Sequence, residues 1–327
     1  IKPEYSSIRY LGEGYFAVTE PGLESYKTLY SKQALMNASG KLITEYKYYN
    51  IGNVYNGAVS VCSDTSTFFI DTDGNRMASL PVFDGIGSLK LHGDVIEADI
   101  DGLKFYCDTR QIIFWQEDQS FELAEGIIVR NKKFRPNRLA LINYPYIEGL
   151  EDPDVQDLIN RALEKLFIEP RKDLSVWDGI EVNDGFAARL LGNLLMVERL
   201  GYDYPYGAAH GQPFRFCYHI DIRSGKFYAF KELFQEGSDY ATKINEMISF
   251  EISKNLASEE PIYYEGEYGF KGISEEPLFV IEKNAVIIYF SPYEIAPYAA
   301  GFPEFLIPFE DIEKYIDKSG DFWRSFN

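Results

Sequence analysis

Histidine and cysteine, which carry much of the metal and nucleophile chemistry of proteins, are scarce in this sequence, with three of each in 327 residues. The cysteines are Cys62, Cys107 and Cys217. This odd set has no Cys-x-x-Cys spacing, which excludes a disulfide framework and a cysteine-based zinc site. Each is therefore expected to be a small buried apolar side chain. A disulfide between Cys62 and Cys107 is the alternative if neighbouring repeats of the chain stack.

Long apolar runs and an excess of positive charge are also missing. No apolar stretch approaches the roughly 18 residues of a membrane helix, so no membrane insertion is expected of the chain as given. The 51 acidic residues against 32 basic ones give a net charge of −19. A polyanion repels nucleic-acid phosphates and anionic lipid headgroups, so neither is expected as a partner. The charge suits a cationic partner, although acidic surfaces more often serve solubility.

The length and the apolar content of the chain favour two domains. A chain of 327 residues exceeds one typical domain, and a hydrophobic content of 46% supplies cores for two. The chain begins at Ile1 rather than at methionine, so an upstream signal or anchor is expected, of a nature that the sequence does not show.

A weak repeat predicts an all-β domain over residues 1–120. Three turn segments align at Gly40, Gly74 and Arg110, which are 34 and 36 residues apart. Glycine supplies the positive φ that a tight turn requires. The alternation of apolar and polar residues over 58–61 and 95–101 is typical of half-buried strands.

The repeat resembles the WG-repeat family of short β-repeats over residues 8–115, although the Trp-Gly pair is absent and the third turn lacks its glycine. The resemblance implies a β-scaffold with an accessory or interaction role and no chemistry. Asp71-Thr72-Asp73-Gly74 has part of a calcium-loop pattern. The third acidic position and the distal glutamate of that pattern are missing, so the segment is interpreted as a hairpin turn.

Residues 121–327 are predicted to form an α+β domain, with an antiparallel sheet packed by two amphipathic helices. The first helix opens with Asp152 as N-cap and Pro153 at its first position, and apolar residues recur along one face as far as Phe167. The second helix is expected at about 238–255, with Phe250 among its inward candidates. A last short helix is expected at 310–316, after a proline-rich extended segment.

Four blocks of this second part carry a family resemblance. They are Tyr144-Pro145-x-Ile147, Tyr204-Pro205-x-Gly207-Ala208-Ala209-His210-Gly211, Leu233-Phe234-x-x-Gly237-Ser238, and Tyr293-Glu294-Ile295-Ala296-Pro297-Tyr298-Ala299-Ala300-Gly301 followed by Ile307-Pro308-Phe309. In this order, over about 180 residues, they resemble the RsiV-like family. That family includes a lysozyme-sensing anti-sigma factor and membrane-anchored polysaccharide deacetylases of Gram-positive bacteria.

The resemblance implies an α+β fold and an extracellular or cell-envelope setting in a Gram-positive bacterium. It also implies a ligand, which is either a protein, such as the strongly basic lysozyme, or the glycan of peptidoglycan. The candidate binding residues come from the two longest blocks and are Tyr204, Tyr206, His210, Tyr293, Glu294 and Tyr298. Tyrosine joins an apolar ring to a polar tip, which suits stacking on sugars or filling a protein interface.

No catalytic residue, metal site or cofactor is predicted. A hydrolase needs a nucleophile and a base within hydrogen-bond reach, and the sequence has no nucleophile elbow. Cys217 and His219 point the same way on a predicted strand, but a free cysteine is usually part of a core. The histidines lack the spacing of zinc enzymes. The sequence therefore favours a non-catalytic envelope protein. The alternatives are an enzyme that acts on wall polysaccharide through His210 and Glu294, and an intracellular interaction scaffold.

Overall fold

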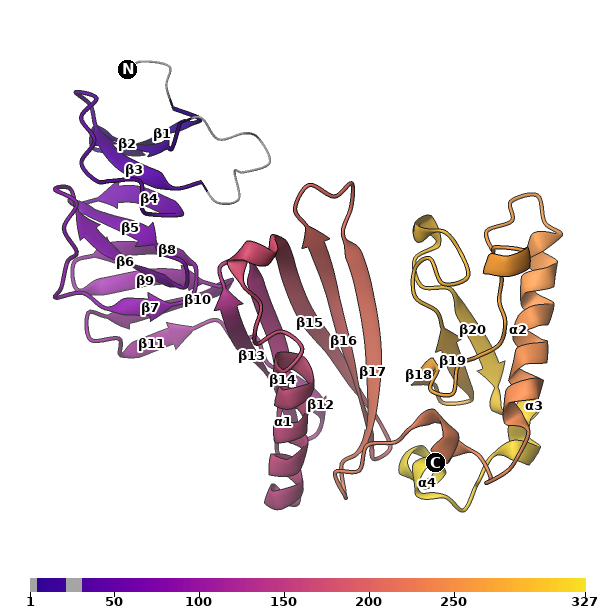
Figure 1. Cartoon of the computed structure of the whole chain (residues 1–327). Coiled ribbons are helices and arrows are strands. Elements are labelled where there is room, and N and C mark those ends of the chain that lie inside the picture. Colours follow the sequence, from indigo (N-terminus) through magenta and orange to yellow (C-terminus); the bar gives the residue numbers. More distant parts are fainter. Residues whose placement is uncertain (1–4, 22–30) are drawn as a thin grey trace.

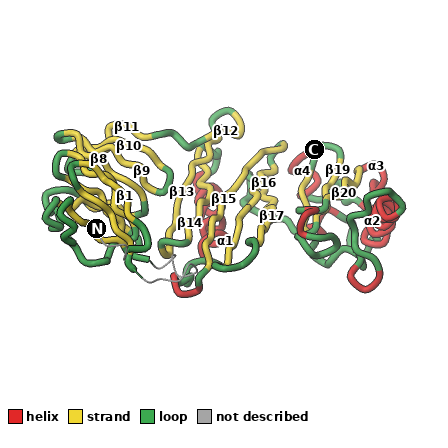
Figure 2. Tube along the Cα trace, turned by 90° about the horizontal axis from the view of Figure 1, so that it is seen from above, coloured by secondary structure: helices red, strands yellow, loops and turns green. Residues whose placement is uncertain are grey.

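Five β-sheets follow one another along the chain in the computed structural model, which describes residues 5–21 and 31–327 (Figure 1). Three small sheets come first, then a six-stranded sheet and then a three-stranded sheet. Seen from above, the group of three small sheets, the six-stranded sheet and the last three-stranded sheet lie in a row, with the six-stranded sheet in the middle (Figure 2). The α+β class, with an all-β N-terminal part, is confirmed.

The first three sheets are antiparallel meanders built from consecutive strands. Their strands are β1 (Ile8–Gly12), β2 (Tyr15–Thr19) and β3 (Gln33–Asn37); β4 (Asn50–Tyr55), β5 (Ala58–Cys62), β6 (Ser66–Asp71) and β7 (Val82–Asp84); and β8 (Gly87–His92), β9 (Val95–Ile100), β10 (Leu103–Asp108) and β11 (Ile113–Gln116). The middle sheet has apolar clusters on both faces. Strand β5 is therefore buried at every position, and the expectation of a half-buried strand at 58–61 is wrong.

The three aligned turns share one hydrogen-bond pattern. The side-chain oxygens of Asn37, Asp71 and Asp108 each accept backbone N–H groups two and four residues further on, at 2.8–3.1 Å. The residue three positions on has positive φ in each turn. In the third turn that residue is Gln111, so the alignment of Arg110 with the two glycines was wrong by one residue. The interpretation of the Asp71 segment as a turn is confirmed.

Both cysteines of the N-terminal part are free and buried, so the disulfide between Cys62 and Cys107 is wrong. The Cys62 thiol donates to the Gly87 carbonyl at 3.1 Å. Burial raises the pKa of both thiols. The expectation of small buried apolar side chains holds for the pair.

The six-stranded sheet holds one helix on one face. Its strands are β12 (Phe121–Ala124), β13 (Ile127–Asn137), β14 (Ala140–Glu148), β15 (Ile180–Leu191), β16 (Leu194–Pro205) and β17 (Gln212–Asp221), in sequence order. Helix α1 (Pro153–Ile168) joins β14 to β15, which is why these two strands are parallel. Asp152 caps α1 by accepting the N–H of Asp154 at 2.9 Å, as predicted.

The last sheet, β18 (Leu278–Ile281), β19 (Ala285–Tyr289) and β20 (Glu304–Pro308), holds the second long helix, α2 (Tyr240–Leu256). The two long helices thus cover two separate sheets. Phe250 is 60% exposed, so its inward placement was wrong. The expected helix at 310–316 is split into α3 (Phe309–Ile312) and a 3-10 turn (Glu313–Tyr315), and α4 (Asp321–Phe326) was not expected.

Strand β16 joins the two C-terminal layers, because its side chains alternate between two cores. Leu195 and Val197 pack toward α1, whereas Leu194 and Met196 pack with the core of the last sheet. Two arginines tie the layers at their margins. Arg189 pairs with Glu282 at 2.8 Å. Arg215 pairs with Glu198 at 2.7 Å and with Glu304 at 2.5 Å.

Candidate binding site

Two of the sequence blocks meet where the six-stranded sheet faces the last sheet. The turn between β16 and β17 carries His210, and the connection between β19 and β20 carries Tyr293 and Tyr298. The ring centroid of His210 lies 4.1 Å from that of Tyr298 and 6.2 Å from that of Tyr293, and both contacts are stacked. Three of the six predicted residues are therefore in contact, although 83 positions separate His210 from Tyr293 in the sequence.

Both ring nitrogens of His210 are engaged. Nδ1 lies 2.9 Å from the carbonyl oxygen of Gly211, and Nε2 lies 3.1 Å from the Tyr293 hydroxyl. A carbonyl oxygen can only accept, so His210 Nδ1 is the donor to Gly211, and Nε2 shares a second hydrogen bond with the Tyr293 hydroxyl. These two hydrogen bonds fix the plane of the His210 ring.

Tyr202 completes the group. Its hydroxyl oxygen accepts the Gly211 N–H at 2.7 Å, and its hydrogen bond with Tyr298 raises the pKa of Tyr298. Tyr202 and Tyr293 are 40% and 49% exposed. We call Tyr202, His210, Tyr293 and Tyr298 the aromatic cluster. Tyr202 was not among the six predicted residues, although its i, i+2 spacing from Tyr204 on a strand was a usable signal.

Tyr293 is held in an unusual backbone conformation, with φ at 71°. A non-glycine residue in this region costs on the order of 1–3 kcal/mol and persists only where its surroundings impose it. Here the Tyr293 N–H donates to the Ala296 carbonyl at 3.1 Å, and the Ser291 N–H donates to the Glu294 carboxylate at 2.9 Å. Glu294 thus closes the turn that presents Tyr293, and among the described residues it makes no hydrogen bond to His210.

The remaining two predicted residues lie beside the cluster. The Tyr204 hydroxyl donates to the Ala208 carbonyl within its own turn, at 3.0 Å. The Tyr206 N–H donates to the Gly179 carbonyl at 2.7 Å and so ties the turn to the 3-10 segment Val176–Asp178. That segment presents Trp177, which is 80% exposed and was missed by the sequence prediction. A lone tryptophan followed by Asp178 and a glycine turn was the signal.

A buried ion network fixes the strands that present the cluster. Asp184 of β15 is fully buried and accepts from Arg171 at 3.1 Å and from Arg199 at 2.5 Å. Arg171 also pairs with Asp203, the neighbour of Tyr202, at 2.7 Å. The Phe214 ring lies 5.2–5.3 Å from both guanidinium groups. The base of the cluster is therefore rigid.

Cys217 and His219 form a second contact between possible reactive groups, with Sγ and Nε2 3.7 Å apart. His219 is buried and stacks on Phe279 with a centroid distance of 4.0 Å. Burial lowers the pKa of His219 to about 3 and raises the pKa of the Cys217 thiol. Catalytic cysteine dyads need a thiolate and an imidazolium. This pair is neutral on both sides and belongs to the core.

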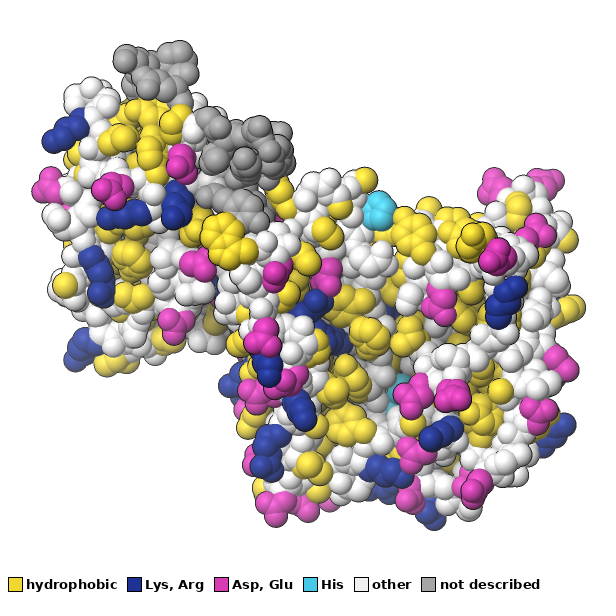
Figure 3. All heavy atoms as spheres, in the orientation of Figure 1, with side chains coloured by type: hydrophobic (Ala, Val, Ile, Leu, Met, Phe, Trp, Pro, Cys, Tyr) yellow, Lys and Arg dark blue, Asp and Glu magenta, His cyan; other side chains and the backbone are white. Residues whose placement is uncertain are grey.

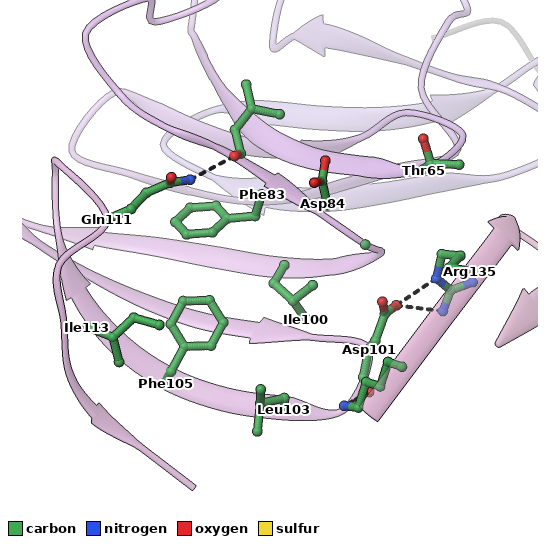
Figure 4. A pocket seen from close by; sticks show the side chains of 13 residues that line it. Thr65, Phe83, Asp84, Ile100, Asp101, Leu103, Phe105, Gln111, Ile113 and Arg135 are labelled. Carbon is green, nitrogen blue, oxygen red and sulfur yellow. Dashed lines mark hydrogen bonds and ion pairs between the residues drawn. The ribbon is translucent and has the colours of Figure 1, made fainter. Parts of the chain in front are cut away.

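A cavity of about 740 Å³ lies where β7, β10 and β11 meet β13 (Figure 4). Phe83, Phe105 and Ile113 form its apolar wall. At the other end Arg135 Nε donates to the Asp101 carboxylate at 2.9 Å. The Lys133 ammonium donates to the Asp101 carbonyl at 2.7 Å, and burial lowers its pKa. These contacts connect Asp101, at the end of β9, to β13. The polar end of the cavity therefore holds the β8–β11 sheet against the six-stranded sheet.

Within residues 5–21 and 31–327, no three His, Cys, Asp or Glu side chains are placed to share a metal ion. In the same part of the chain, no helix is long and apolar enough to cross a bilayer.

Comparisons with known proteins find similarity over part of the chain. Residues 231–310 match the model of a family described as a protein of unknown function, DUF3298. Over 125 residues the chain is 29% identical to the peptidoglycan-N-acetylmuramic acid deacetylase PdaC of Bacillus subtilis, an alignment that covers 36% of this chain. The chain spans only 26% of the length of that protein.

Two solved structures of DUF3298 proteins are similar to this chain. One, from Bacteroides fragilis, is 18% identical, has a TM-score of 0.43, and is matched over 61% of this chain and 93% of its own. The other, from Pseudomonas aeruginosa, is 15% identical, has a TM-score of 0.39, and is matched over 62% of this chain and 95% of its own. The match to the DUF3298 model itself covers residues 231–310, in the C-terminal part of the chain. The matched residues include Tyr293 and Tyr298 but not Tyr202 and His210.

Proposed function

We propose that this chain is a non-catalytic protein of the bacterial cell envelope that binds the glycan of peptidoglycan through the aromatic cluster. The observation that carries the proposal is the cluster itself, in which four rings from two distant segments meet at the surface. Hydrogen bonds fix these rings before a ligand arrives, and a preorganised surface loses less entropy on binding.

The chemistry of the cluster suits a sugar. The C–H face of a pyranose packs against an aromatic ring, and tyrosine adds a hydroxyl at the ring's edge for the sugar's polar groups. PdaC is a peptidoglycan-N-acetylmuramic acid deacetylase. A shared domain in such a protein supports a wall glycan as the ligand of this chain.

The other titratable groups support binding without catalysis. Glu294 closes a backbone turn and, among the described residues, makes no hydrogen bond to His210. Glycoside hydrolysis needs two carboxyl groups facing one bond, and Glu294 instead holds the backbone at Ser291. Cys217 and His219 are buried and neutral.

The test is retention of the chain by purified insoluble peptidoglycan, measured as the fraction that sediments with it at moderate salt. Tyr298→Ala removes the ring that stacks on His210, and we expect the affinity to fall about tenfold or more, as for a hot-spot aromatic residue. The matched control is Tyr10→Ala, since Tyr10 is an exposed tyrosine of the first sheet. An unretained wild-type chain, or equal loss in both variants, contradicts the proposal.

A basic protein ligand is the second candidate, and the net charge of −19 favours it. Figure 3 shows acidic side chains spread over the visible face rather than gathered in one patch, which fits long-range attraction better than a shaped acidic site. Lysozyme is the probe because it is strongly basic. Retention of lysozyme at moderate salt that is lost in Tyr298→Ala would make the cluster a protein-binding site. Retention only at low ionic strength indicates non-specific attraction.

A further inference from the structure

Strand β11 is an edge strand with an unusual surface. It pairs with β10 on one side and with no other strand in the described part of the chain. Ile112, Ile113, Phe114 and Trp115 are each between 49% and 61% exposed. Tyr106 of β10 lies edge-on to Trp115 at 5.6 Å and widens the patch. Proteins usually cover or charge such an apolar edge, because it offers unpaired backbone groups to another strand.

A bulge shapes what this edge presents. Trp115 faces Tyr106 and Ile113 faces Cys107, so Phe114 is an extra residue without a partner on β10. Tyr106 and Cys107 are adjacent and point to opposite faces of the sheet. Trp115 therefore lies on the outer face, whereas Ile113 lines the cavity on the inner face, as Figure 4 shows. Ile112, the neighbour of Ile113, is placed on the outer face with Trp115.

We propose that β11 pairs antiparallel with β11 of a second copy of this chain, about a two-fold axis between Ile113 and Phe114. Residues that oppose each other across an antiparallel pair share a face. This register sets Ile112 opposite Trp115 on the outer face and Ile113 opposite Phe114. All four exposed apolar side chains then have apolar partners, and a two-fold axis makes the contact self-complementary.

The charges at the two ends of the strand select a second copy as the occupant. Arg110 lies in the turn before β11, next to Gln111 with its positive φ, and so stands outside the paired strand. The same register brings this turn of one copy to the end of the strand where Glu117 of the other copy lies, twice over. The Arg110 side chain is well exposed, and it pairs with Asp108 of its own turn at 2.7 Å. The Glu117 carboxylate has no ion-pair partner among the described residues. Two chains of net charge −19 repel each other, so specific self-association needs such a local attraction.

The size of the contact sets its strength. A short strand and a few flanking side chains bury less than the roughly 1,200–2,000 Å² of a standard stable interface. The bulge also twists the edge and limits the paired length. We therefore expect a weak dimer, with a dissociation constant on the order of 10–100 μM.

The test is sedimentation velocity of the whole chain over about 1–200 μM, a range that brackets the expected constant. Phe114→Lys should leave a monomer at every concentration, because it puts a charge at the axis. The matched control is Ile8→Lys, at an exposed isoleucine of another edge strand, β1, and it should dimerise like the wild type. Circular dichroism confirms that each variant is folded.

A charge exchange tests the register without touching the apolar residues. Arg110→Glu should weaken the dimer about threefold or more, as for an exposed charge pair counted twice. Arg110→Glu combined with Glu117→Arg should restore it. A wild-type chain that is monomeric throughout overturns the proposal and leaves a strand of a different protein as the occupant. A dimer that survives Phe114→Lys, or a combined variant that stays as weak as Arg110→Glu, also overturns it.

Discussion

The aromatic cluster and the β11 edge both expose large apolar rings, but the chain holds them in different ways. In the cluster, the polar atoms of His210 and Tyr202 are hydrogen-bonded and the rings are fixed over a rigid base. At β11 the side chains have no hydroxyl group, and the outer edge of the backbone has no strand partner in the described residues. Fixed rings with polar tips suit a small polar ligand, whereas an unpaired apolar strand suits another strand.

The largest effect is expected where the cluster meets its base. Asp184→Asn removes the carboxylate that neutralises Arg171 and Arg199, so two guanidinium groups lose a buried partner. We expect the free energy of unfolding in urea to fall by about 3–5 kcal/mol, as for a broken buried ion pair. The matched control is Asp157→Asn, at an exposed pair with Arg161, which should change it by less than about 0.5 kcal/mol. Similar effects of the two variants would mean that the base is not rigid.

A pH effect is expected from the layer between the two C-terminal sheets. The folded pKa of His219 is about 3, below the ordinary value of about 6.5 in the unfolded chain. The unfolded state therefore binds the proton first, so His219 lowers the free energy of unfolding as the pH falls from about 6.5 toward 3. The slope is up to about 1.4 kcal/mol per pH unit. For His219→Phe, the free energy of unfolding in urea should decline less steeply with falling pH over this range. An unchanged slope would contradict the burial of a neutral His219 between the two sheets.

Substitutions of Tyr293 are expected to affect ligand binding and stability differently. Tyr293→Gly removes a ring and also removes the strain of holding a non-glycine residue at positive φ. We expect retention by peptidoglycan to fall, while the free energy of unfolding stays within about 1 kcal/mol of the wild type or rises. Tyr293→Ala, which keeps the backbone strain, is the control and should be the less stable of the two. A glycine variant that binds normally would exclude Tyr293 from the ligand site.

The smallest effect is expected in the N-terminal turns. Gly40 has φ at 81° with no atom within 4 Å of the position that a Cβ would take. Gly40→Ala should therefore lower the free energy of unfolding only by the strain of an alanine at positive φ, about 1 kcal/mol. Gly74→Ala should cost more, because its Cβ would lie 2.8 Å from Thr44. Neither variant should change retention or dimerisation, and a change in either would link the turns to one of the two surfaces.

Local signals predicted the parts of the fold that depend on few neighbouring residues. The cap at Asp152 and the turns after Asn37 and Asp71 depend on side chains that bond their own backbone, and these predictions are confirmed. The third turn was misaligned by one residue, because Gln111 adopts positive φ without being glycine. Phe250 was misplaced because both faces of α2 carry apolar residues.

The candidate site was predicted in its residues but not in its geometry. His210 and Tyr293 come from blocks that the sequence singled out, yet their contact depends on how the last sheet packs against β16 and β17. No local pattern encodes that packing. Trp177 was missed for the same reason, since exposure at a rim is decided by the surrounding sheets. Tyr202 belongs to a tyrosine-rich segment, 202–206, that the sequence offers for stacking, but it was left out of the six site residues. The role of the cluster as a binding site stays a prediction.

The most direct test measures both surfaces in the same pair of variants. Tyr298→Ala and Phe114→Lys are each assayed for retention by insoluble peptidoglycan and for dimerisation by sedimentation velocity. We expect Tyr298→Ala to lose retention and keep the dimer, and Phe114→Lys to keep retention and lose the dimer. If Tyr298→Ala is retained like the wild type, the aromatic cluster is not the glycan site and the central claim is wrong.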